Sequence, residues 1–152
     1  MIIESIVAVF ATFGFGIIFN IGRKNLLFAS LGGGLSWFIY KLCLNNGFSL
    51  YAAFFTSAVI FSIYSEICAR TFKSPVTTFV ICALIPLVPG SGMYYTMYEV
   101  IKGNISTSVT MMISTIASAG CLALGVIFVS TITRLINSVK SKKSRKRTGL
   151  PN

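Results

Sequence analysis

Long runs without charged residues are the feature that most constrains how this chain can fold. The 152 residues include thirteen Lys and Arg and three Glu, and between these lie five uncharged, mostly apolar runs of 16 to 31 residues. A helix needs about 20 residues to cross a hydrocarbon core of ~30 Å, so the run lengths match membrane spans. The sequence therefore predicts an all-α integral membrane protein with about five transmembrane helices.

Turn residues and charges between the runs predict where each helix ends. The cluster Asn45-Asn46-Gly47 is typical of a turn and separates the second helix from the third. The first run follows Glu4 and no basic segment, so we expect it to be retained and not cleaved as a signal peptide. We expect a transmembrane domain over residues 1–138 and a basic cytoplasmic tail over residues 139–152. The expected spans are residues 2–21, 26–44, 48–69, 75–101 (broken near 86–92) and 106–133.

The positions of the cations predict how the chain is oriented. Lys and Arg in short loops are held on the cytoplasmic side of a membrane. Eleven of the thirteen cations follow the first, third and fifth spans, and only Lys41 and Lys102 lie at the other end. We therefore expect a multi-pass protein of the cell inner (plasma) membrane with its N-terminus outside and its C-terminus in the cytoplasm.

The basic tail and the missing residue types limit the possible functions. The tail has no aromatic residue for base stacking, so we expect it to contact anionic lipid and no nucleic acid. The chain contains no Asp and no His, which removes the Ser-His-Asp triad, histidine metal sites and the phosphorylated aspartate of an ion pump. Its four cysteines form no CxxC pair. We therefore expect no enzyme, no cofactor and no metal.

Small residues recur at spacing four along several of the expected helices. In lipid, such faces let helix backbones approach closely. The positions at spacing four are Ala8, Thr12, Gly16 and Asn20 in the first helix and Ala117, Cys121 and Gly125 in the fifth. The second helix instead contains the run Gly32-Gly33-Gly34, with Ser30 and Ser36 on either side. We interpret them as packing faces, and their number indicates contact with further helices, in a homo-oligomer or with another membrane subunit.

One face of the third helix becomes increasingly polar toward its C-terminal end. Ser62, Glu66 and Arg70 follow one another at spacing four. An ionisable group within a span is costly and usually faces a partner, a cavity or a pathway. Two interpretations of Glu66 stay open: a structural ion pair with Arg70, or a carboxylate that binds a cation or takes up a proton during transport.

The fourth helix contains the strongest local signal, the segment Pro86-Leu87-Val88-Pro89-Gly90-Ser91-Gly92. The two prolines remove backbone donors, so the carbonyls of Cys82 and Ile85 lose their usual partners. Broken helices of this kind form substrate sites in secondary transporters, where the free N–H groups of the second half-helix face anionic groups. The alternative is a helix that ends at proline, followed by an interfacial helix with a belt of tyrosines.

The same residues resemble a known family. Ser65 to Arg70, Lys73 to Thr77 and Ile85 to Gly90, followed by Tyr95 and Met97, are similar to the C-terminal module of threonine/serine exporters, the ThrE family. In that family the module is either fused behind a larger membrane module or forms a separate small subunit of the YjjB type. The resemblance implies export of threonine or serine together with a YjjP-like partner subunit. Because some such pairs are linked to succinate, a dicarboxylate exporter is the alternative.

These observations combine into one hypothesis for a substrate site. The substrate carboxylate would meet the N–H groups of Gly90, Ser91 and Gly92, and Glu66 would bind the ammonium or a coupling proton. The candidate substrate-binding residues are Glu66, Pro86, Pro89, Gly90, Ser91, Gly92, Asn20, Ser62, Arg70 and Tyr94. A membrane scaffold that stabilises another protein and transports nothing is the alternative from a different functional class.

Overall fold

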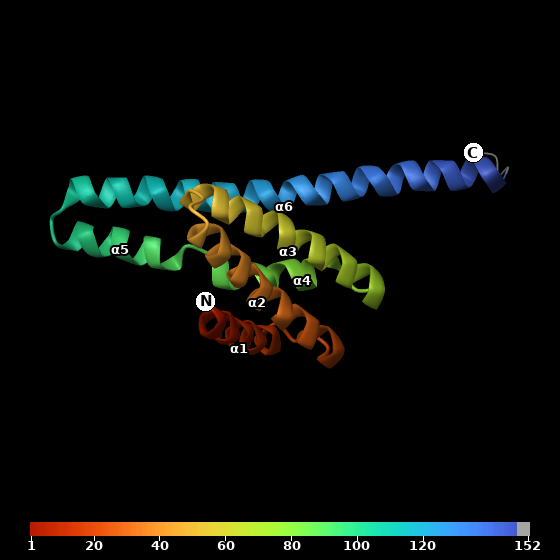
Figure 1. Cartoon of the computed structure of the whole chain (residues 1–152), viewed down its shortest axis with the longest axis horizontal. Helices are drawn as coiled ribbons and strands as arrows, with labels where there is room; N and C mark the ends of the chain where they lie inside the picture. Colours follow the sequence, from red (N-terminus) through yellow and green to blue (C-terminus); the bar gives the residue numbers. More distant parts are fainter. Residues whose placement is uncertain (149–152) are drawn as a thin grey trace.

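The described part of the chain is entirely helical. The computed structural model describes the backbone of residues 1–148 and the side chains of residues 1–138, and this part contains no strand (Figure 1). The elements are α1 (Ile2–Ile18), α2 (Arg23–Asn45), α3 (Leu50–Phe72), α4 (Val76–Leu84), the 3₁₀ turn η1 (Ile85–Leu87), α5 (Gly90–Ile101) and α6 (Ile105–Thr148). The helix α6 continues well past residue 133, where the last span was expected to end. The rest of the expected basic tail, residues 149–152, and the tail side chains from residue 139 lie outside the described residues.

The number of helices that can span a membrane is lower than the five expected. Three described helices are long and apolar enough, namely α2, α3 and α6 as far as Ser138, and the number is four if the bent pair of α4–η1 with α5 counts as one span. The helix α1 has 17 residues and rises only about 26 Å, less than a ~30 Å hydrocarbon core. It ends early because Asn20 adopts a positive φ of 54°. The span expected over residues 2–21 is therefore longer than the helix α1 that the structure contains.

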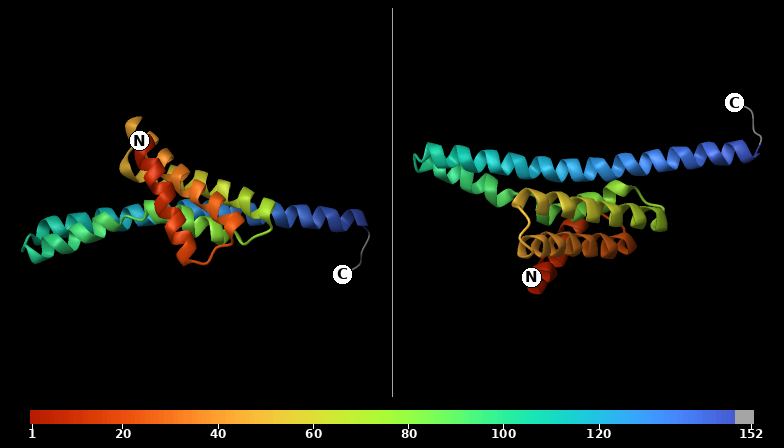
Figure 2. Two further views of the ribbon diagram at one scale, coloured as in Figure 1. Left: turned by 90° about the horizontal axis from the view of Figure 1, so that it is seen from below. Right: turned by 45° about the horizontal axis from the view of Figure 1, so that its top comes forward.

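The helices α2 and α6 make most of the contacts that hold the helices together. The helix α2 packs against α1, α3 and α4, while α6 packs against α3 and α5 (Figures 1 and 2). In both figures the hairpin of α5 and the start of α6 projects past the other helices at one end. The last part of α6 projects at the opposite end. The helix α3 packs against both α4 and α6, so it lies on one side of both helices.

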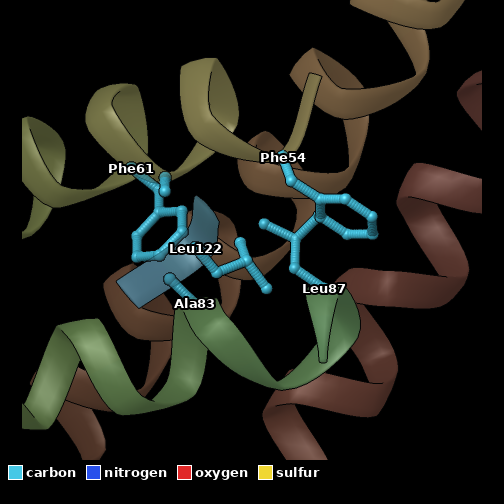
Figure 3. Close-up of a cluster of buried hydrophobic side chains, with 6 residues drawn as sticks. Phe54, Phe61, Ala83, Leu87 and Leu122 are labelled. Atoms are coloured by element: carbon cyan, nitrogen blue, oxygen red, sulfur yellow. The ribbon is translucent and has the colours of Figure 1, made fainter. Parts of the chain in front are cut away.

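The largest apolar cluster lies where α3, α4 and α6 meet (Figure 3). Phe54 and Phe61 reach down from α3, Ala83 and Leu87 come from α4 and η1, and Leu122 comes from α6. Phe61, Ala83 and Leu87 are at most 1% exposed. Because the chain is apolar on both its inner and outer surfaces, this close packing, and not a difference in polarity, holds the helices together.

Buried serine hydroxyls connect α2, α3 and α4 at the level of this cluster. Ser57 Oγ donates to the backbone carbonyl of Ser36 at 2.6 Å, and Ser36 Oγ lies 2.9 Å from the carbonyl of Ala83. Both serines are fully buried. The hydrogen bonds run between helices, so they fix the position of α4 against its neighbours immediately before the break.

The glycine run of α2 is a contact surface for α1. A Cβ atom at Gly33 would overlap the side chain of Thr12, which is itself fully buried. One at Gly34 would overlap Val9. In contrast, Gly14 in α1 has no atom within 4 Å of a built Cβ. These glycines allow α1 and α2 to approach more closely than any larger residue would.

We expect Gly33→Ala to lower the free energy of unfolding by about 1–3 kcal/mol, the usual effect of overpacking a tight contact. The readout is the thermal midpoint of monodisperse protein in detergent. Gly14→Ala is the matched control, and we expect it to be neutral or to stabilise by up to about 1 kcal/mol because alanine favours helix. Equal midpoints for the two variants would contradict the close approach of α1 and α2.

Candidate functional site

The break between α4 and α5 is a short 3₁₀ turn. The expected loss of hydrogen bonds at the prolines is wrong in its details, because i to i+3 bonds replace the missing ones. The N–H of Ile85 donates to the carbonyl of Cys82, and the N–H of Val88 lies 3.1 Å from the carbonyl of Leu84 and 3.4 Å from that of Ile85. Tightening of this kind is common at helix ends. The chain bends by 44° at this point.

The first turn of α5 has donors without backbone acceptors. Gly90 N–H donates to the carbonyl of Val88 at 2.7 Å, and Met93 N–H donates to that of Pro89 at 3.2 Å. Between them, the N–H groups of Ser91 and Gly92 have no backbone acceptor within the described residues. Free N–H groups and the helix dipole make the start of a helix favourable for an anion.

Ser91 and Gly92 line a cavity that we name the break cavity. Its volume is about 260 Å³. It lies level with the first turns of α3, since Leu50 and Phe54 line it. Thr115 and Ser118 on α6 donate their hydroxyl protons to their own helix, which leaves their oxygen lone pairs able to accept from a ligand. The lining residues are Trp37, Tyr40, Leu50, Phe54, Pro86, Leu87, Val88, Pro89, Ser91, Gly92, Ser114, Thr115 and Ser118.

A second cavity, of about 340 Å³, contains Glu66, and we name it the carboxylate cavity. The Glu66 side chain is 16% exposed. Ser62, one turn away, is 2% exposed, and its Oγ has no hydrogen-bond partner in the part of the chain that the structure describes. The lining residues are Ser62, Glu66, Val76, Thr77, Val80, Val126, Val129, Ser130, Thr133, Arg134 and Asn137.

Glu66 also forms an ion pair with Arg70, as the interpretation of Glu66 as a structural residue predicts. The Arg70 Nε atom lies 3.7 Å from Glu66 Oε2, which is an ion pair too long for a hydrogen bond. Arg70 Nη2 donates at 3.1 Å to the Oδ1 atom of Asn137 on α6. Arg70 is half exposed and does not line the carboxylate cavity. Its contacts hold α3 and α6 together beside the cavity.

A third cavity, of about 330 Å³, lies between the other two, and we name it the apolar cavity. It shares Val80 and Val126 with the carboxylate cavity, and Val88 and Pro89 with the break cavity. Ala119, Leu122 and Ala123 complete its α6 side. The three cavities therefore lie next to one another along α4 and α6, and together we call them the α4–α6 groove. Its two ends are polar and its middle is apolar.

One row of residues on α6 follows the groove from end to end. Residues four apart on a helix form a ridge inclined to its axis. The row consists of Ser114, Ser118, Leu122, Val126, Ser130 and Arg134, all of which line the groove. Sequence reasoning missed these residues, together with Thr77 and Thr115. The spacing of Ser114, Ser118, Ser130 and Arg134 could have indicated them.

The candidate residues predicted from the sequence divide between the two ends of the groove. Pro86, Pro89, Ser91 and Gly92 line the break cavity, and Ser62 and Glu66 line the carboxylate cavity. Twelve residues of α3, a rise of about 18 Å, separate Phe54 in the first cavity from Glu66 in the second. One small solute cannot touch both ends at once, so the single site of the hypothesis becomes two.

Four other candidates do not line the groove. Asn20 is exposed at the end of α1, and Tyr94 is 63% exposed and stacks on Tyr98 at 6.2 Å between ring centroids. Gly90 is exposed with no atom near a built Cβ, and Arg70 lies beside the carboxylate cavity, as described above.

Comparison with known proteins gives one clear result. Residues 4–132 match the family model described as Threonine/Serine exporter, ThrE. The matched segment contains both ends of the groove except for Thr133, Arg134 and Asn137. No solved structure matches the chain.

Proposed function

The chain belongs to the threonine/serine exporter family, and from this premise we propose that it is one subunit of a secondary-active exporter of threonine and serine. In this proposal it is a transporter and not an enzyme: the solute is bound, moved and released unchanged. An electrochemical gradient supplies the energy. The observation that carries the proposal is the α4–α6 groove, which joins two polar cavities through an apolar middle and includes a broken helix.

The break cavity supports binding of a carboxylate. The free N–H groups of Ser91 and Gly92 donate to the carboxylate of the amino acid, and the positive end of the α5 dipole favours its charge. The lone pairs of the Thr115 and Ser118 hydroxyls accept from its ammonium or hydroxyl group. Trp37 and Tyr40 form an aromatic wall on the α2 side.

The open side of the groove supports a partner subunit. Val88 and Ile127 are 47% and 59% exposed at the apolar cavity, while the polar ends of the same groove would be costly to leave in contact with lipid. We propose that a second membrane subunit of the YjjP type covers the groove. Both proteins would then contribute to the path of the solute.

The gathering of cations at one end of the helices supports the proposed orientation. Asn25 Nδ2 donates to Ser74 Oγ at 2.7 Å, which places the start of α2 beside the end of α3. The cations near these two positions, together with Arg134, belong on the cytoplasmic side. The protein then lies in the cell inner (plasma) membrane with its N-terminus outside, and the basic tail contacts anionic lipid.

The proposal is tested by flux into liposomes. We expect vesicles that contain this chain and its YjjP-like partner to move radiolabelled serine and threonine down an imposed gradient, at a rate at least about tenfold above empty vesicles and above either subunit alone. Preference for succinate would instead establish the dicarboxylate exporter. Equal flux with the partner alone would establish the scaffold function, because this chain would then add no transport.

A further inference from the structure

The carboxylate cavity brings together two opposite charges from different helices. Glu66 comes from α3 and Arg134 from α6, and both line the same space of about 340 Å³. Hydroxyl groups of Thr77, Ser130 and Thr133 also line it. The cavity therefore offers an anion, a cation and several hydrogen-bonding groups, all within one polar end of the groove.

The buried serine in this cavity has no hydrogen-bond partner among the described residues. Ser62 is 2% exposed, and its Oγ makes no hydrogen bond. A buried hydroxyl without a partner destabilises a fold, so such groups are usually satisfied by water or by a ligand. Ser62 lies one turn from Glu66 on the same face of α3 and lines the same cavity. Its position indicates that a polar ligand atom belongs beside Glu66.

Glu66 and Arg134 do not form an ion pair with each other in the described structure. The ion pair of Glu66 within the described residues is with Arg70, at 3.7 Å. Among these residues Arg134 forms no ion pair. The other two acids of the chain are committed elsewhere, since Glu4 pairs with Lys41 at 2.9 Å and Glu99 accepts from Asn104 at 2.7 Å. Arg134, which is exposed, therefore lines the cavity together with Glu66 but forms no ion pair with a carboxylate of the described residues.

We infer that the carboxylate cavity is a second binding site for the zwitterion of an α-amino acid, separate from the break cavity. The ammonium group binds Glu66 and Ser62 Oγ, and the carboxylate binds the guanidinium of Arg134, which can hold it with two parallel hydrogen bonds. Ser130 or Thr133 meets the hydroxyl of serine or threonine. The inference rests on the proposed function and gives the exporter a loading site at the end of the groove where its cations gather.

The charge pattern also determines what the site rejects. A dicarboxylate would place its second carboxylate near Glu66, where repulsion opposes binding. An amine without a carboxylate would leave Arg134 without a counter-charge, and a hydroxy acid without an ammonium would leave Glu66 and Ser62 without a donor. Only a molecule that carries both charges at close range satisfies both ends of the cavity.

Competition for serine binding and flux tests the site in the reconstituted complex with the partner subunit. The competitors are glycerate, which lacks the ammonium, and ethanolamine, which lacks the carboxylate. For the wild type we expect both to compete at least about tenfold less well than serine itself. Glu66→Gln should raise the KM for serine about tenfold and lower the preference over glycerate. Arg134→Gln should have a similar KM effect and lower the preference over ethanolamine.

Ser62→Ala keeps the test decisive if the charge variants do not fold. It removes an unpartnered hydroxyl, so we expect an unchanged or higher thermal midpoint together with serine affinity about fivefold lower, the effect of one lost hydrogen bond. Glu99→Gln and Lys102→Gln, at the other end of the molecule, are the controls and should leave both preferences unchanged. If the wild type transports serine but all three cavity variants keep its KM and both preferences, the second site does not exist and the exporter stands. If the wild type moves no amino acid, the proposed function itself is wrong.

Discussion

Replacing Gly92 is expected to stop transport while leaving the protein folded. Gly92 lies against α6 in the break cavity, where an added Cβ atom would come within 3.3 Å of Thr115 Cβ and overlap its hydroxyl. Alanine must therefore displace Thr115 or move α5, and overpacking of this kind costs about 1–3 kcal/mol. We expect serine flux to fall about tenfold in Gly92→Ala and below detection in Gly92→Val, because both the free N–H groups and the cavity change shape.

The control for this series is Gly120→Ala on α6. Gly120 has no atom within 4 Å of a built Cβ and does not line the groove, so we expect wild-type flux and an equal or higher thermal midpoint. Expression level and monodispersity in detergent separate a blocked cavity from an unfolded protein. Wild-type flux in a well-folded Gly92→Val protein would mean that the solute does not enter the break cavity.

Filling the middle of the groove is expected to have the second large effect. Ala123 is exposed and lines the apolar cavity that joins the two polar ends. A phenylalanine at this position places an aromatic ring in a space of about 330 Å³ without disturbing the buried cluster. We expect flux of serine through the complex to fall at least about tenfold in Ala123→Phe, since an obstacle at this point separates the two ends.

The neighbouring residue provides a matched control. Leu124 is 62% exposed and does not line the groove, so Leu124→Phe places the same aromatic ring on α6 outside the groove. We expect its flux to equal that of the wild type, while equilibrium binding of serine is retained in both variants. Equal flux in Ala123→Phe and Leu124→Phe would show that solute does not travel along the groove.

Some features could be predicted from the sequence because their causes are local. The 44° bend follows from Pro86, Pro89 and the glycines after them, which act on their own backbone. The turn after α2 follows in the same way from Asn45, Asn46 and Gly47, the last of which has a φ of 81°. In both cases a few adjacent residues limit the backbone, whatever packs around them.

Other features depend on contacts between distant parts of the chain. Glu66 and the break are close in sequence, so one site was the natural hypothesis, but the antiparallel course of α3 and α4 places them at opposite ends of a groove. Ser118 and Ser130 could equally have been packing residues, because small hydroxyl side chains serve both purposes in membrane helices. Arg134 was assigned to topology alone, since nothing in its own segment indicates that a carboxylate lies across from it on α3.

The lengths of α6 and of its row of groove residues can be compared with the thickness of a hydrocarbon core. The whole helix rises about 66 Å over its 44 residues, roughly twice the thickness of a hydrocarbon core, so it is longer than is needed to cross such a layer. The row from Ser114 to Arg134 covers twenty residues, a rise of about 30 Å. In the proposed path, a solute that moved from Arg134 to Ser114 would cover about the thickness of a ~30 Å hydrocarbon core along the surface of a single helix.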